Sequence, residues 1–112
     1  MYLVTGGAGF IGSNIVWALE SQGVGKGIVC DRLRQDNKWR NLAKRELAGI
    51  VPPENLFDFL EANATNIEAI IHMAAISSTI ETDIDLIIDT NFRLSVDLWH
   101  WCTQHHVRFI YA

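Results

Sequence analysis

Three glycines near the start of the chain have the spacing of a phosphate-binding loop. They are Gly6, Gly9 and Gly12, in the segment TGGAGFIG at residues 5–12. Gly6 would allow a tight turn, Gly9 a close approach of backbone N–H groups to a pyrophosphate, and Gly12 close packing of the following helix on the sheet. A helix that begins here directs the positive end of its dipole toward the phosphates. The pattern therefore predicts a dinucleotide site.

An acidic residue, Asp31, follows this loop by about 20 residues, at the end of a second apolar run. Its carboxylate could accept hydrogen bonds from the adenosine ribose, which favours NAD because a 2′-phosphate would be repelled. A basic segment comes directly after it and favours NADP, since guanidinium groups bind phosphate well. The basic residues are Arg32, Arg34, Lys38 and Arg40. Both NADP and NAD remain open as cofactors, and so does a solvated charged loop with no ligand.

These residues are positioned by apolar runs that alternate with helical periodicity. Short apolar runs predict strands at residues 2–5, 27–30, 50–51, 69–73 and 108–111. Apolar residues at helical spacing predict helices at 10–22, 53–60 and 85–105, with a loop over 31–45. Strands that alternate with helices need crossover connections. We therefore expect an α/β fold, a Rossmann-type doubly wound parallel sheet that is incomplete at about five strands. Phe10 and Ile11 would begin the first helix, beside the cofactor.

Length and charge limit the classes of function. A chain of 112 residues is the size of one domain, so residues 1–112 are expected to form one NAD(P)-binding Rossmann domain. The net charge of -4 argues against nucleic acid as a partner. No run of apolar residues approaches the roughly 20 that cross a bilayer, so we expect no membrane association. Cys30 and Cys102 fit neither a disulfide framework nor a zinc site, and a cytoplasmic protein is expected.

The glycine motif, Asp31 and the sequence HMAA at residues 72–75 together resemble the NAD-dependent epimerase/dehydratase family of extended short-chain dehydrogenases/reductases. The likeness covers essentially the whole chain and is greatest to the heptose epimerases of that family. The likeness to the heptose epimerases rests on three segments, residues 71–79, 89–92 and 107–112. The resemblance implies a nucleotide-sugar substrate, transient transfer of a hydride to the nicotinamide, and its return with inverted configuration. Whether the protein forms a homo-oligomer is left open.

The resemblance further implies that the segment after the fourth strand lies along the nicotinamide side of the cofactor. The contacts carried over are Met73, Ala74, Ala75, Ile76 and Ser77. Ligands of open α/β sheets bind at the carboxyl ends of strands, and small alanines leave room for them. Alternatively, these small residues could serve only to let a helix and a strand pack closely together. Asn91 would hold this segment or the cofactor, unless it is a surface asparagine of the helix.

The family's catalytic Tyr and Lys, and its Ser or Thr after the fifth strand, have no counterpart in residues 1–112. We therefore expect an amino-terminal, dinucleotide-binding part that is inactive by itself, with the substrate domain outside it. A metal site is not expected, because His100 and Cys102 would point to different sides of a helix. Two alternatives remain: a reductase or dehydratase of the same fold, and a non-catalytic module that senses NADP.

Overall fold

A computed structural model describes residues 1–33, 37–75 and 82–112. Its centre is a parallel sheet of five strands in the order β3-β2-β1-β4-β5. The strands are β1 (Tyr2–Thr5), β2 (Gly27–Cys30), β3 (Gly49–Val51), β4 (Ala69–His72) and β5 (Arg108–Tyr111). The predicted α/β fold with a parallel sheet is confirmed. The central strand β1 pairs with β2 on one side and with β4 on the other. The chain therefore adds β2 and β3 on one side of β1, and then β4 and β5 on the other side.

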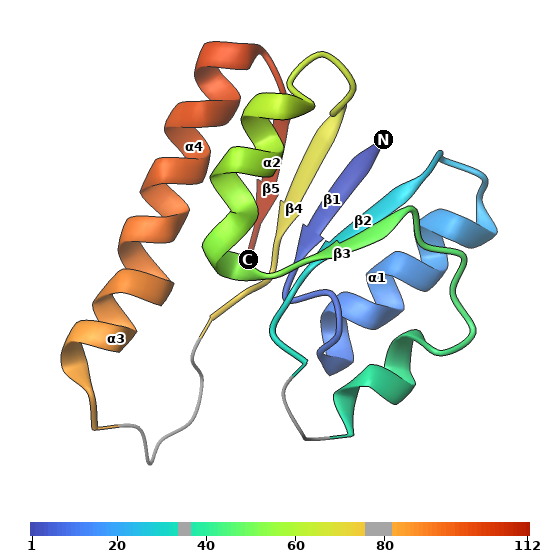
Figure 1. Ribbon diagram of the computed structural model, residues 1–112, viewed down its shortest axis with the longest axis horizontal. Coiled ribbons are helices and arrows are strands. Elements are labelled where there is room, and N and C mark those ends of the chain that lie inside the picture. Colours follow the sequence, from blue (N-terminus) through green and yellow to red (C-terminus); the bar gives the residue numbers. More distant parts are fainter. Residues whose placement is uncertain (34–36, 76–81) are drawn as a thin grey trace.

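Helices cover both faces of this sheet (Figure 1). Helix α1 (Phe10–Ser21) lies on one face, and α2 (Leu56–Ala62) and α4 (Leu94–His105) lie on the other. The short helix α3 (Ile84–Ile88) extends past the ends of the strands and continues into α4 through a π-helical turn, Asp89–Arg93. Two 3-10 turns complete the described elements, Lys38–Leu42 and Pro53–Asn55.

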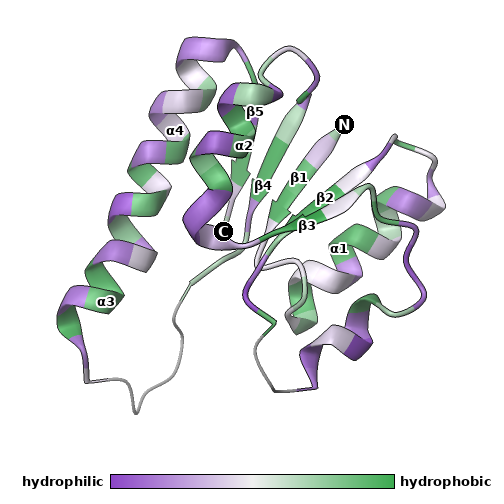
Figure 2. Ribbon diagram, in the orientation of Figure 1, coloured by the Kyte–Doolittle hydropathy of each residue, from purple (hydrophilic) through white to green (hydrophobic). Residues whose placement is uncertain are grey.

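The sheet is buried on both faces. Successive residues of a strand point to opposite faces, so each strand contributes side chains to two separate hydrophobic cores. Leu3 and Ile70 pack with Leu60 and Leu98 of helices α2 and α4. Their neighbours in the strands, such as Val4, face helix α1. Hence the strands read as continuous apolar runs and not as alternating ones. Figure 2 shows this band of hydrophobic strands between helices with polar outer faces. Each fully buried leucine contributes about 1.5–3 kcal/mol to folding.

Two segments differ from the prediction. The helix expected at 85–105 begins at Ile84 and is interrupted by the π turn, and its first part extends past the ends of the strands. Leu86, expected on its buried face, is 43% exposed. The segment 31–45, expected as a loop, contains the 3-10 helix Lys38–Leu42. Leu42 anchors this turn by packing against the α1 side of the sheet, where it is 6% exposed.

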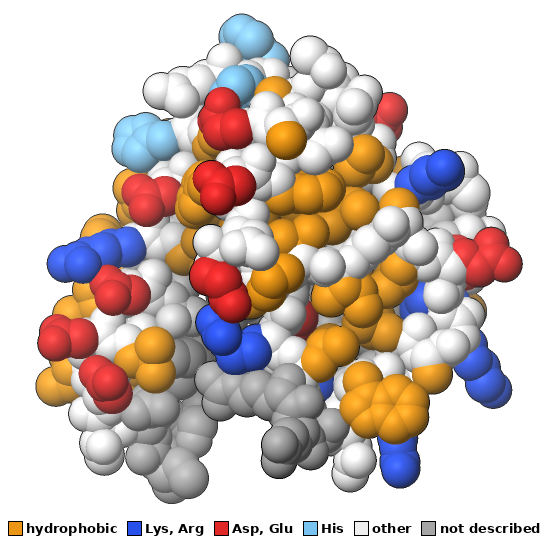
Figure 3. Space-filling model, in the orientation of Figure 1, with side chains coloured by type: hydrophobic (Ala, Val, Ile, Leu, Met, Phe, Trp, Pro, Cys, Tyr) orange, Lys and Arg blue, Asp and Glu red, His pale blue; other side chains and the backbone are white. Residues whose placement is uncertain are grey.

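Charge is unevenly spread over the surface. In the view of Figure 3, most acidic side chains gather on the side of α2, α3 and α4, and most Lys and Arg side chains lie on the side of α1. Within the described residues, no helix has the length and apolar character needed to cross a membrane.

Candidate dinucleotide-binding site

The carboxyl ends of three strands meet beside the glycine loop. Thr5 ends β1 and is in register with Cys30 at the end of β2 and with His72 at the end of β4. The sheet order reverses at β1, and open α/β sheets bind ligands in the crevice at such a reversal. A cavity of about 550 Å³ opens there. Seven of the predicted contacts line it: Gly6, Asp31, Arg32, Lys38, Met73, Ala74 and Ala75.

The glycine loop turns at Gly6 as its sequence predicted. Gly6 has a φ of 67°, and a Cβ there would lie 2.9 Å from the backbone nitrogen of Ala74. A side chain at Gly6 would therefore close the approach between this loop and the segment after β4. A Cβ at Gly12 would lie 2.2 Å from the carbonyl oxygen of Gly6. The close packing expected of Gly12 is present, but its partner is the loop itself and not the sheet.

Helix α1 begins directly after this loop, with Gly9 as its N-cap. No side chain of the described residues caps it, and Ser13 and Asn14 both donate to the carbonyl of Phe10. The first N–H groups of a helix need acceptors, which phosphate oxygens can supply. The side chains of Phe10 and Ile11 are 82% and 60% exposed and do not line the cavity.

Asp31 ties the glycine loop to the basic segment. One carboxylate oxygen accepts the N–H of Ala8 at 2.9 Å. The other accepts the N–H of Arg32 at 2.7 Å and the ammonium of Lys38 at 2.8 Å. A carboxylate has about four lone-pair positions, so one position on the Ala8 side is left for a ribose hydroxyl. The far side of the loop is held by Asn41, which donates to the carbonyl of Ala8 at 2.8 Å.

The basic segment supplies two cations to the cavity. Lys38 is paired with Asp31, and Arg32 forms an exposed ion pair of 3.1 Å with Glu54. Arg40 does not line the cavity, and its guanidinium lies 5.6 Å from the ring centre of Trp39. Arg34 lies outside the described residues. The basic loop predicted from sequence therefore reaches the cavity through Arg32 and Lys38.

Two buried polar residues hold the segment after β4, and sequence reasoning missed both. The hydroxyl of Thr5 accepts the N–H groups of Met73 and Ala74 at 3.1 and 3.2 Å. It also lies 2.6 Å from Nδ1 of His72, whose Nε2 lies 2.9 Å from the hydroxyl of Ser95. Burial lowers the pKa of His72 below its ordinary value, which favours the neutral ring. A polar residue at the buried end of an apolar strand was the available signal, since such groups need partners.

The opposite wall of the cavity comes from α3, the π turn and the start of α4. Leu86, Asp89, Thr90 and Leu94 form it, and none of them was predicted as a site residue. Asn91 follows Thr90 in the π turn and is exposed, with its carbonyl accepting the hydroxyl of Ser95. Its contact with the cofactor stays a prediction. Ile76 and Ser77 lie outside the described residues, and Gly9, Phe10, Ile11 and Gly12 stand beside the cavity without lining it.

Cys30 also lines the cavity, at the end of β2. It is 3% exposed, and burial together with the carboxylate of Asp31 raises its pKa to about 12. The thiol is therefore protonated at neutral pH and acts as a small apolar wall. In the described part of the chain, no group of three His, Cys, Asp or Glu side chains is arranged to hold a metal ion.

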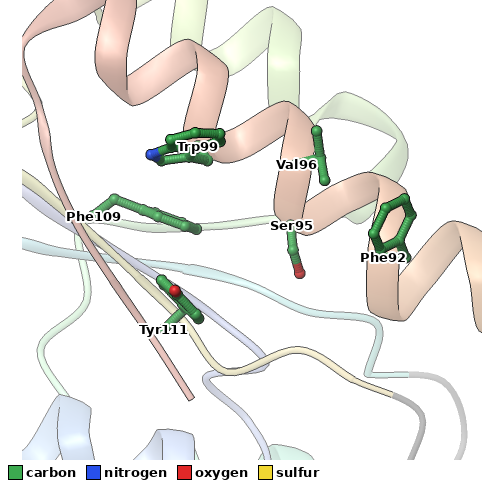
Figure 4. Close-up of a pocket in the computed structure, with 6 residues that line it drawn as sticks. All are labelled: Phe92, Ser95, Val96, Trp99, Phe109 and Tyr111. Atoms are coloured by element: carbon green, nitrogen blue, oxygen red, sulfur yellow. The ribbon is translucent and has the colours of Figure 1, made fainter.

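A second, apolar cavity of about 320 Å³ lies between helix α4 and strand β5. Figure 4 shows Trp99 and Phe92 on the helix side and Phe109 and Tyr111 on the strand side. The hydroxyl of Ser95 points from the helix toward the strands, which is the direction of its contact with His72. Trp99, Phe92 and Tyr111 are 57%, 65% and 67% exposed, so this side of the molecule carries an open apolar surface.

The main cavity therefore offers the parts that a dinucleotide needs. It has a glycine loop that a Cβ would obstruct, an uncapped helix start, a carboxylate with a free lone pair, and a floor of small residues. The first two groups fit phosphates, the carboxylate fits a ribose, and Ala74 and Ala75 leave room for a flat ring.

Known proteins are similar to this chain in both sequence and fold. The NAD dependent epimerase/dehydratase family model matches residues 2–112. An ADP-L-glycero-D-manno-heptose-6-epimerase from Fusobacterium nucleatum is 45% identical over the whole chain, which covers 34% of that protein. The chain thus spans about a third of the length of the curated relatives it matches.

Solved structures agree with this assignment. A dTDP-glucose 4,6-dehydratase from Bacillus anthracis, in complex with NAD, has a TM-score of 0.76 and is 26% identical. A UDP-glucose 4-epimerase from Thermotoga maritima has a TM-score of 0.75 and is 29% identical. Each comparison covers 98% of this chain and 36% of the known structure. By its sequence, its glycine loop and its sheet, the chain belongs to the NAD-dependent epimerase/dehydratase family.

Proposed function

We propose that this chain is the dinucleotide-binding part of a nucleotide-sugar epimerase that acts on ADP-glycero-manno-heptose. The observation that carries the proposal is the cavity between the glycine loop and the Met73–Ala75 segment, with Asp31 at its side. The sugar is inferred from the relative in Fusobacterium nucleatum, an ADP-L-glycero-D-manno-heptose-6-epimerase. When bound, the nicotinamide would accept a hydride from the sugar and return it to the opposite face.

Within this proposal the chain's own residues bind and orient the cofactor. The N–H groups at the start of α1 would hold the pyrophosphate, through the backbone of Phe10, Ile11 and Gly12. Asp31 would accept a ribose hydroxyl on its free lone pair. Met73, Ala74 and Ala75 would support the nicotinamide end, joined by Ile76, Ser77 and Asn91. Proton transfer to the sugar would come from residues outside positions 1–112.

We infer NADP as the preferred cofactor, with NAD as the weaker one. Lys38 neutralises much of the charge of Asp31, and Arg32 lines the same cavity with a half-exposed side chain. Together they would attract a 2′-phosphate that Asp31 alone would repel. Arg32 would exchange its exposed partner Glu54 for the phosphate, at small cost because exposed ion pairs contribute about 0–1 kcal/mol.

Calorimetric titration of the protein with NADP and NAD tests both statements. Tighter binding of NADP supports the inference, and the variants R32A and K38A should then lose this preference. K44A is the matched control, because Lys44 is an exposed cation of the same basic segment that does not line the cavity. A folded protein that binds neither dinucleotide would overturn the proposed function.

A dehydratase is the second candidate, supported by the similarity to the dTDP-glucose 4,6-dehydratase of Bacillus anthracis. The sugar decides between the two functions. The longer protein that carries this chain, incubated with an ADP-heptose, would yield an isomer of equal mass if it is an epimerase. A dehydratase would instead release water and lower the product mass by one water molecule.

We also propose a cytoplasmic homo-oligomer. Both cysteines are free and buried, which suits a reducing compartment. The open apolar surface around Trp99 and Tyr111 would suit contact with a second copy or with the rest of the longer protein, because soluble proteins seldom expose large apolar patches. Analytical ultracentrifugation of wild type and of W99K tests this, with a fall in apparent mass expected for the variant. A monomeric wild type would contradict it.

A further inference from the structure

His72 stands between the two walls of the main cavity. It is the last residue of β4 and only 4% exposed. On one side its Nδ1 lies 2.6 Å from the hydroxyl of Thr5, which holds the segment after β4. On the other side its Nε2 lies 2.9 Å from the hydroxyl of Ser95 on helix α4. One ring therefore connects the floor of the cavity with the helix that forms its opposite wall.

The donors and acceptors around this ring fit a single arrangement. When Ser95 donates its hydroxyl hydrogen to the carbonyl of Asn91 at 3.3 Å, its oxygen accepts a hydrogen from Nε2 of His72. A neutral imidazole that is protonated on Nε2 presents Nδ1 as an acceptor. Thr5 then donates to Nδ1, and its two lone pairs accept the N–H groups of Met73 and Ala74.

This chain of hydrogen bonds begins and ends in backbone that borders the cavity. At one end are the N–H groups of Met73 and Ala74, which line it. At the other end is the carbonyl of Asn91 in the π turn, next to the lining residues Asp89 and Thr90. π turns are uncommon and recur at functional sites. The hydroxyl of Ser95 joins the ring of His72 to this turn.

We propose that His72 is a positioning residue for the cofactor site, whose neutral imidazole with its hydrogen on Nε2 fixes the Met73–Ala75 segment and the π turn relative to each other. The proposal rests on the proposed function, because it assigns the ring a part in dinucleotide binding. Thr5 and Ser95 transmit its effect to the two walls. The ring itself is buried behind the cavity and is not among its lining residues.

Three substitutions of His72 separate the two halves of this chain. H72N places an amide oxygen near the position of Nδ1 and keeps an acceptor for Thr5. H72Q places an amide N–H near the position of Nε2 and keeps a donor for Ser95. H72F fills the same space and keeps neither bond. We expect H72F to weaken NADP binding by about 10- to 30-fold, and H72N, H72Q and S95A by about 5-fold each.

Thr103 provides the matched control. Its hydroxyl donates to the carbonyl of Trp99 at 2.8 Å, the same bond to the preceding turn of α4 that Ser95 makes. Thr103 is exposed and is not bonded to a ring nitrogen. T103A should therefore bind NADP with the affinity of wild type. Affinities are compared per folded protein, with circular dichroism at the temperature of the titration as the measure of folding.

Nitrogen-15 NMR of the imidazole rings gives a readout that a purely structural role of His72 would not require. The proposal expects the tautomer with hydrogen on Nε2, and a hydrogen on Nδ1 would overturn it. If wild type binds NADP and H72F binds it equally well, this proposal falls while the proposed function stands. If wild type binds neither dinucleotide, both fall. Should H72F fail to fold, S95A and the tautomer decide the outcome.

Discussion

The carbonyl oxygen of Gly6 lies where a side chain of Gly12 would begin. A Cβ at position 12 would be 2.2 Å from that oxygen and 2.9 Å from the Cα of Gly7. Both neighbours are backbone atoms of the glycine loop, so they cannot move aside as a flexible side chain would. We predict that G12A destabilises the protein by about 3 kcal/mol or more and abolishes NADP binding. Urea unfolding and calorimetry measure the two effects.

Gly49 is the control for this substitution. It lies in β3, its φ is not in the left-handed region, and a Cβ would meet Cδ1 of Ile28 at an ordinary 3.5 Å. G49A should change the free energy of unfolding by no more than about 0.5 kcal/mol. Equal losses in G12A and G49A would show that the contact with Gly6 is not the cause.

Asp31 is predicted to contribute both to stability and to cofactor choice. D31N weakens the charge-assisted bonds to Ala8 and Lys38, and should lower the free energy of unfolding by roughly 1–3 kcal/mol. It also removes the charge that would repel a 2′-phosphate, so the ratio of NADP to NAD affinity should rise. Asp97, exposed on α4, supplies the control variant D97N. A ratio that stays constant or falls in D31N would contradict the role assigned to its charge.

Much of this architecture could be predicted because its signals are local. Strands β1, β2 and β5 have the predicted bounds, and β4 ends one residue early at His72. Parallel strands buried on both faces leave uninterrupted apolar runs, which are easily recognised. The glycine spacing and the position of Asp31 likewise encode a turn and a strand end that lie close in sequence. Seven predicted contacts consequently line one cavity.

The remaining features depend on contacts between distant segments. The π turn at Asp89–Arg93 interrupts a sequence whose periodicity is helical throughout, and Ser95 reaches His72 across 23 residues. Glu54 meets Arg32, and Asn41 meets Ala8, only because the fold brings their loops together. Leu86 and Ile87 were predicted on the buried face of this helix, yet the segment extends past the sheet and Leu86 is 43% exposed.

The buried ring of His72 predicts a dependence of stability on pH. Burial holds its pKa in the folded protein below the ordinary value of 6.5, and its neighbours Thr5, Ser95 and the ring of Phe109 carry no charge. The unfolded chain therefore binds a proton near pH 6.5 that the folded chain does not yet bind. The contribution to stability is complete above that pH and is lost as the pH falls toward the lower, folded pKa.

Urea unfolding of wild type and H72N between pH 8 and pH 5 measures this contribution. The other histidines are present in both proteins, so the difference between the two slopes reports on His72. Wild type should lose stability more steeply below pH 6.5 than H72N, by up to about 1.4 kcal/mol per pH unit. Parallel slopes would show that His72 titrates alike in the folded and the unfolded chain.

The two cysteines are predicted to be unreactive in the folded protein. Burial, helped by Asp31 and Glu54, raises the pKa of Cys30 to about 12, and burial raises that of Cys102 to about 11. Both side chains are 3% exposed or less. Because the thiolate is the reactive form, an aromatic disulfide reagent at pH 8 should modify neither residue until the protein opens.

The variants C30S and C102S assign the rates to single positions. Both thiols should react at the rate of opening and accelerate together with urea. A fast reaction at Cys30 alone would mean that the cavity at the end of β2 opens locally, and bound NADP should then slow that reaction but leave Cys102 unaffected.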